Sequence, residues 1–198
     1  MDDFVKTLQD VERKFAPNIV TAKRVVSPLD QPTSVPTNRG GDKMHPRGND
    51  YAPAFAELLD GVRVDTIVEL GVLTGVSLAM WCELFPKAQV VGLDIDLNRV
   101  EWDDLVSRGA FNRNRPLMFE WDAFAPAPIR GVSGIDVFID DGPHKLDAIR
   151  VVAEFVKPLM RGGGRYIVED VPEAFGVLQE IWPDREVKRW GRLCGVFL

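Results

Sequence analysis

Several features that direct a chain to other protein classes are scarce in these 198 residues. Cys82 and Cys194 are the only cysteines, and they form neither a CxxC pair nor a zinc-binding spacing, so two reduced, buried thiols are expected. Lys and Arg form no dense run and the net charge is −6, which argues against a nucleic-acid partner held through phosphates. No apolar run reaches the ~20 residues of a membrane span. The acidic start at Met1–Phe4 is unlike a signal peptide, so we expect a cytoplasmic protein.

Hydrophobic residues make up 45% of the chain, which is typical of a globular domain with a substantial core. Residues 2–15 carry apolar side chains at helical spacing, and residues 51–60 do so again. Between them, residues 16–49 are interrupted by prolines and glycines, which indicates a lid, a binding loop or a linker. We therefore divide the chain into an N-terminal helix with a Pro-rich segment (1–49) and a ligand-binding domain (50–198).

From residue 64 the pattern alternates between short apolar strands and helices. The strands are expected at 65–70, 88–94, 116–121, 135–139, 165–168, 186–189 and 194–198. The helices are expected at 77–85, 99–107, 145–160 and 173–181, with Gly162–Gly164 stopping the third of these. Apolar strands that alternate with helices predict an α/β fold of Rossmann-like type, with a mostly parallel seven-stranded sheet covered on both faces.

The ends of the first three strands predict a nucleoside site, because ligands of such sheets bind beyond the carboxyl ends of the strands. Gly71 and Gly75 allow a sharp turn and a close approach of the backbone. Asp94 lies 23 residues after Gly71, at a distance suited to an acid that binds both ribose hydroxyls. Asp122 follows the third strand, where a side-chain oxygen could meet an adenine amino group.

The sequence of this turn discriminates between two classes of cofactor. A dinucleotide-binding turn has the pattern GxGxxG, but Leu73 stands where its middle glycine would be. S-adenosylmethionine (SAM) has no pyrophosphate, and its ammonium group would suit the acid at Glu69. The segments Glu69-Leu70-Gly71 and Leu93-Asp94 resemble the first two motifs of class I SAM-dependent methyltransferases. The predicted donor-binding residues are Glu69, Gly71, Gly75, Ser77, Asp94 and Asp122.

Paired acids follow the next two strands, Asp140-Asp141 and Glu169-Asp170. Four neighbouring carboxylates would repel one another, and a hard divalent cation such as Mg²⁺ would relieve that repulsion. The alternative is that one acid of each pair caps a helix and the other faces solvent. His144 lies three residues after Asp141 and could take a proton from a substrate hydroxyl, or it could merely satisfy a helix N-terminus.

The segment Ile139-Asp140-Asp141-Gly142-Pro143-His144, followed by Val168-Glu169-Asp170, narrows the resemblance. It is similar to the metal-dependent sugar O-methyltransferases of macrolide biosynthesis, which include the macrocin and mycinamicin enzymes, and to the related cephalosporin-biosynthesis methyltransferase. The resemblance implies that Asp141, Glu169 and Asp170 bind Mg²⁺ and that His144 is the general base. Pro143 departs from the Ser or Ala that is common before this histidine in the family.

A fainter resemblance lies upstream, in Asp42-Lys43 followed by Tyr51-Ala52-Pro53. The corresponding family segment lies near the active site, which implies contact of Lys43, His45 or Tyr51 with the acceptor. The spacing here is longer and Asn49 stands where the family often has histidine, so solvated loop residues are the alternative.

These observations predict a SAM- and Mg²⁺-dependent O-methyltransferase of a small hydroxylated acceptor and leave homo-oligomerisation open. The resemblance implies that the acceptor is a sugar or a glycosylated natural product. Two rivals remain. A catechol-type O-methyltransferase would use the same metal with a lysine base, for which Lys145 is available, and a non-catalytic Rossmann-like protein would bind SAM or a nucleotide without chemistry. The aromatic residues Phe111, Trp121, Phe124 and Trp182 are expected in the core rather than in an acceptor pocket.

Overall fold

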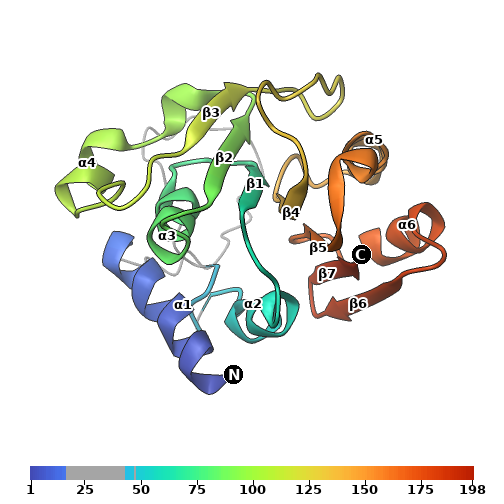
Figure 1. The fold of residues 1–198 in the computed structure, drawn as a ribbon, viewed down its shortest axis with the longest axis horizontal. Helices are drawn as coiled ribbons and strands as arrows, with labels where there is room; N and C mark the ends of the chain where they lie inside the picture. Colours follow the sequence, from blue (N-terminus) through green and yellow to red (C-terminus); the bar gives the residue numbers. More distant parts are fainter. Residues whose placement is uncertain (17–42, 47) are drawn as a thin grey trace, which may run out of the picture.

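The computed structural model describes residues 1–16, 43–46 and 48–198. Its centre is a seven-stranded sheet with the order β3-β2-β1-β4-β5-β7-β6 (Figure 1). The strands are β1 (Thr66–Leu70), β2 (Gln89–Asp94), β3 (Leu117–Glu120), β4 (Ile135–Asp140), β5 (Met160–Val168), β6 (Glu186–Trp190) and β7 (Leu193–Phe197). β1 to β5 pair in parallel, whereas β7 runs antiparallel to both β5 and β6. The predicted mostly parallel sheet is confirmed.

Helices cover both faces of the sheet, as predicted. The described helices are α1 (Asp2–Phe15), α2 (Ala52–Leu59), α3 (Val76–Leu84), α4 (Trp102–Ser107), α5 (Leu146–Val156) and α6 (Ala174–Ile181). α1 packs against α2 and α3 on one face, and α5 packs against α6 on the other (Figure 1). Alternate residues of one strand feed the two cores, so Ile67 lies in the first core and Val68 in the second.

The long helix predicted at 145–160 is wrong at its carboxyl end. α5 stops at Val156, and Lys157–Leu159 form a short 3-10 turn that contains Pro158, which cannot continue an α-helix. The three glycines that were expected to stop the helix lie inside β5, which starts at Met160. At Gly164 a Cβ atom would come within 2.7 Å of the carbonyl oxygen of Asp136, so the close pairing of β4 and β5 requires glycine there.

The segment predicted as a lid or linker lies largely outside the described residues, and Asp42 lies outside them too. Where the chain is described again, Met44 is fully buried and its backbone N–H donates to both carboxylate oxygens of Glu12 at 3.0 Å. Because α1 supplies Leu8 and Phe15 to the first core, it is packed as part of the same unit as the sheet. The division of the chain at residue 49 stays a prediction.

Both cysteines are free and buried, in agreement with the expectation from their spacing. Within the described parts of the chain, no helix is long and apolar enough to cross a membrane.

The strand order places the functional edge of the sheet. β1 has β2 and then β3 on one side and β4 on the other, so the connections diverge between β1 and β4. In open α/β sheets this divergence leaves a crevice at the carboxyl ends of the strands, where ligands bind. The residues that follow β1, β2, β4 and β5 are therefore brought to one place.

Candidate active site

A cavity of about 480 Å³ opens at this carboxyl edge. Residues after five strands line it, joined by side chains from α1 and from the segment before α2. The sequence-predicted site residues in this lining are Lys43, Gly71, Ser77, Asp94, Asp122, Asp141, His144, Glu169 and Asp170. One cavity thus holds most of the residues predicted for the donor, the cation and the base.

The turn after β1 shows why Gly71 is glycine. Its φ angle is +89°, and a Cβ atom there would lie 2.0 Å from the carbonyl oxygen of Asp141. The backbone N–H of Asp141 in turn donates to the Leu70 carbonyl at 2.9 Å. The close approach that glycine permits is therefore to the turn after β4, so this residue joins the two sides of the cavity directly.

Asp94, at the end of β2, is held by the turn that replaces the dinucleotide pattern. Leu73 has a φ angle of +51°, and its backbone N–H donates to Oδ2 of Asp94 at 3.0 Å. Oδ1 of Asp94 accepts from the N–H of Asp96 at 3.0 Å. Each carboxylate oxygen has a second lone pair, so Asp94 is oriented at the cavity wall and can still accept from a ligand.

After β3, Asp122 accepts from the N–H of Phe124 at 2.9 Å, which fixes its side chain at the cavity. Phe124 is 48% exposed and lines the same cavity, so the expectation that it belongs to the core is wrong. A short loop that turns its aromatic ring outward leaves no hydrophobic pattern from which to predict this. Phe111, Trp121 and Trp182 are buried as expected, although Trp121 also reaches the cavity.

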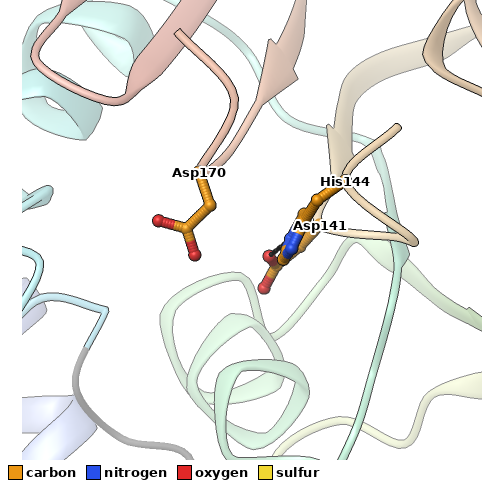
Figure 2. Close-up of side chains that lie close together, drawn as sticks. All are labelled: Asp141, His144 and Asp170. Carbon is orange, nitrogen blue, oxygen red and sulfur yellow. Dashed lines mark hydrogen bonds and ion pairs between the residues drawn. The ribbon is translucent and has the colours of Figure 1, made fainter. Parts of the chain in front are cut away.

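A cluster of three side chains from the ends of β4 and β5 faces the cavity. Asp141, His144 and Asp170 each offer a ligand atom within 4.8 Å of the other two (Figure 2). His144 and Asp170 have φ angles of +54° and +64°, a left-handed conformation that non-glycine residues seldom adopt. Such strained residues concentrate at functional sites, so the cluster has the properties of a built site.

His144 is coupled to Asp141, with its Nε2 atom 3.0 Å from Oδ1 (Figure 2). The hydrogen bond to Asp141 raises the pKa of the imidazole, burial opposes the rise, and the charges of the surrounding aspartates add to it. The His144 side chain is 43% exposed. It is therefore accessible from the cavity and is more basic than an ordinary histidine.

Asp140 does not join this cluster. Its side chain is buried, accepts from the Tyr166 hydroxyl at 2.8 Å and from the Gly142 N–H at 3.3 Å, and burial raises its pKa to about 6. Of the first acid pair, one member thus supports the turn and the other faces the cavity.

Asp170 is held from behind by two side chains that are remote in sequence. The Tyr51 hydroxyl donates to Oδ1 of Asp170 at 2.7 Å, and the Arg192 guanidinium lies 3.2 Å from the same oxygen. Burial and the neighbouring Asp170 carboxylate raise the pKa of Tyr51, so the hydroxyl keeps its proton and remains a donor. Tyr51, predicted as a residue that touches the acceptor, is placed as a support of Asp170 and is not among the residues that line the cavity.

Lys43 lies among three carboxylates from three strand ends. Its Nζ atom is 2.8 Å from Oε1 of Glu69, 3.0 Å from Oε1 of Glu169 and 3.5 Å from Oδ2 of Asp141. Burial alone would lower the pKa of Lys43, but the charges of the three acids hold it well above its usual value. Burial raises the pKa of the Glu169 carboxyl above its usual value, and the nearby Lys43 ammonium opposes that rise. Lys43 is therefore a charged, buried residue of the site.

Other predicted residues occupy supporting positions. Within the described ranges, Glu69, Gly75 and His45 are not part of the cavity lining. Gly75 has a φ angle of +88° at the start of α3, where a Cβ atom would meet Val100 at 2.9 Å. Lys145, the candidate base of the catechol-type alternative, lies over the ring of Phe124 at 5.6 Å and is not in the lining either.

Sequence reasoning missed Glu12. This residue of α1 is 2% exposed, lines the cavity and accepts from Met44. The only signal was an acid on the apolar side of an amphipathic helix.

Comparisons with known proteins find related sequences and a related fold. No family model matches the chain. The chain is 33% identical over 109 residues to the mycinamicin VI 2''-O-methyltransferase of Micromonospora griseorubida, covering 55% of this chain and 24% of that protein. It is 29% identical over 157 residues to the 8-demethyl-8-α-L-rhamnosyl tetracenomycin-C 2'-O-methyltransferase of Streptomyces olivaceus, covering 73% of this chain and 37% of that protein. The chain thus spans well under half the length of these relatives.

Solved structures agree on the fold. The MycE methyltransferase of the mycinamycin pathway, in complex with Mg, S-adenosylhomocysteine (SAH) and mycinamycin VI, matches with a TM-score of 0.56 at 20% identity, over 74% of this chain and 49% of that one. TrmN from Thermus thermophilus matches with a TM-score of 0.54 at 17% identity, over 73% of this chain and 46% of that one. The resemblance predicted from the motifs is confirmed: the chain has the Rossmann-like fold of class I methyltransferases and is similar in sequence to sugar O-methyltransferases of macrolide pathways.

Proposed function

We propose that this protein transfers a methyl group from SAM to a hydroxyl group of a small molecule, with a divalent cation as cofactor, and that the acceptor is a sugar or a glycosylated natural product. One observation carries the proposal: the nucleoside-type residues after β1 to β3 and the acid–histidine cluster after β4 and β5 line the same cavity. The sequence similarity to sugar O-methyltransferases supports the class of acceptor.

On the donor side, Asp94 is the acceptor for the ribose hydroxyls and Asp122 for the adenine amino group. The turn from Gly71 to Ser77 shapes the wall against which the donor lies. Glu69 is the candidate partner of the donor's ammonium group, because its Oε2 atom is buried and has no hydrogen-bond partner in the described structure. Its Oε1 atom is already engaged by Lys43.

On the acid side, Asp141 and Asp170 fit a divalent cation, because their carboxylate oxygens and His144 converge within 4.8 Å. Glu169, next to Asp170 in the chain and in the cavity lining, is the predicted third ligand. Such a cation, when bound, lowers the pKa of a coordinated hydroxyl group.

His144 is the proposed general base. In the tautomer that donates its Nε2–H to Asp141, the lone pair is on Nδ1, which takes the proton of the acceptor hydroxyl. The remaining contribution of the cavity is to orient the acceptor oxygen toward the donor methyl group.

The test is methyl transfer from radiolabelled SAM to a panel of acceptors that contains rhamnosyl and other deoxysugar glycosides, catechols and simple phenols. We expect turnover on a glycoside, loss of turnover with EDTA and recovery with Mg²⁺. Turnover on catechols alone would support the catechol-type alternative. SAH binding without turnover on any acceptor would support a non-catalytic SAM-binding protein.

A further inference from the structure

Lys43 stands out because its positive charge lies against two of the carboxylates that are proposed to bind a cation. Its side chain is buried, and its Nζ atom contacts Glu69, Asp141 and Glu169 at 2.8–3.5 Å. Two of these acids, Asp141 and Glu169, are proposed ligands of the divalent cation. The ammonium group and the cation would therefore share carboxylates.

The backbone around Lys43 holds this charge in place. The carbonyl oxygen of Lys43 accepts from the N–H of Tyr51 at 2.9 Å, and the next residue, Met44, is fully buried and bonded to Glu12. The peptide unit that follows the Lys43 side chain is therefore held at its carbonyl oxygen and at its N–H, and the ammonium stays within reach of the acids. Tyr51 also bonds Asp170, so the same short segment contacts the acid cluster twice.

The charge of Lys43 has opposite effects on the acids with and without a divalent cation. Two like charges a few ångströms apart repel each other appreciably even at the effective dielectric of about 20 that is typical of such sites. A divalent cation on Asp141 and Glu169 is thus opposed by the Lys43 charge. Without a cation, however, the same ammonium group relieves repulsion among acids of which Glu69 and Glu169 are each 1% exposed.

We propose that Lys43 is an internal counter-cation: it positions Glu169 and Glu69 in the cation-free protein and keeps divalent-cation binding weak. This inference rests on the proposed cation site. It assigns to Lys43 a positioning role through the carboxylates, in place of contact with the acceptor. It also links the donor side to the cation side, because one ammonium group bridges Glu69 and Glu169.

The experiment measures Mn²⁺ binding by electron paramagnetic resonance in the full chain. Lys43→Met removes the charge and keeps the length of the side chain, and Lys43→Arg keeps the charge. Lys87→Met is the matched control, since Lys87 is exposed just before β2, at the opposite edge of the sheet. We expect Lys43→Met to bind Mn²⁺ at least about tenfold more tightly than the wild type, and the other two variants to bind like the wild type.

Thermal unfolding gives the second readout. Without a divalent cation, Lys43→Met should unfold at a lower temperature than the wild type, because buried carboxylates lose their partner. Mn²⁺ should raise the unfolding temperature of Lys43→Met by more than it raises the unfolding temperature of the wild type. If Lys43→Met folds only with Mn²⁺, the cation is replacing the ammonium, as proposed.

Unchanged or weaker Mn²⁺ binding by Lys43→Met, with normal binding by the wild type, overturns the role of Lys43 and leaves the proposed cation site standing. Failure of Lys43→Met to fold at any Mn²⁺ concentration also overturns it. Absence of Mn²⁺ binding in both the wild type and Lys43→Met overturns the cation site itself, and the role of Lys43 with it.

Discussion

The two halves of the cavity are built by different means. In the donor half, after β1 to β3, the carboxylates are oriented by nearby backbone: Asp94 by the N–H groups of Leu73 and Asp96, and Asp122 by that of Phe124. In the acid half, after β4 and β5, side chains from distant segments do this work, as when Tyr51 bonds Asp170 across 119 positions of sequence. Asp94 and Asp122 are thus held by the loops of the donor half, whereas the acid half depends on the segment before α2, which reaches the donor half only where Lys43 contacts Glu69.

If the two halves are built independently, a change in one half should leave ligand binding in the other half intact. The change with the largest expected effect is His144→Ala. His144→Ala should lower the turnover rate by about 10²–10⁴, the usual contribution of a general base. SAH binding, measured by isothermal titration calorimetry, should stay within about twofold of the wild type, because His144 is partly exposed and belongs to the acid half. A parallel loss of SAH binding would show that the halves are not separable.

Gly71 joins the two halves through the backbone, as Lys43 does through Glu69 and Glu169, so a change at Gly71 should affect both halves. Gly71→Ala places a Cβ atom against the Asp141 carbonyl and strains a φ angle of +89°. We expect the free energy of unfolding to fall by about 1–3 kcal/mol and the affinities for both SAH and Mn²⁺ to fall together. Gly61→Ala is a matched control, with a φ angle of +68° and no atom within 4 Å of the added Cβ, and it should show strain without the loss of ligand binding.

Asp94→Asn should affect the donor half alone. The change replaces one carboxylate oxygen with an NH2 group, which cannot accept a hydrogen bond from the Leu73 N–H or from a ribose hydroxyl. A loss of about 1.5 kcal/mol, or roughly tenfold in SAH affinity, is expected. Mn²⁺ affinity measured on the same sample should not change; if it falls equally, the change has unfolded the site.

Tyr51→Phe should have the smallest effect, and it should affect the acid half alone. It removes the hydroxyl that donates to Asp170 but leaves Arg192 in place. Mn²⁺ affinity should fall by about three- to tenfold, the worth of one hydrogen bond, while SAH affinity stays constant. A fall in SAH affinity alone would instead place Tyr51 on the donor side.

The same contrast explains what the sequence could predict. The position of Gly71, Asp94 and Asp122 at one cavity could be predicted because it follows from strand ends and short spacings, which are local properties. The mostly parallel sheet and its two covered faces follow from the alternation of strands and helices, and both are confirmed. Pro158 could have predicted the end of α5, because proline cannot continue an α-helix, but the end was assigned to the three glycines that follow it.

The partners of the acids could not be predicted in the same way. Nothing in the pattern around Lys43 indicates that its ammonium group contacts Glu69 and Glu169, because the contact depends on where α1 and α2 dock. The acceptor contact expected of Tyr51 came from the family resemblance, and a resemblance could not show that its hydroxyl donates to Asp170. Long-range polar pairs are set by tertiary packing, and a single sequence carries little trace of them.

The central claim is that a methyl donor and a divalent cation occupy one cavity. Nuclear magnetic resonance of SAM in the presence of the protein and Mn²⁺ tests it directly, because a paramagnetic ion broadens the signals of nearby protons. We predict strong broadening of the SAM methyl signal that is lost in an Asp141→Asn variant, which still binds the donor. Saturating binding of both ligands without broadening would place them in separate sites and contradict the account.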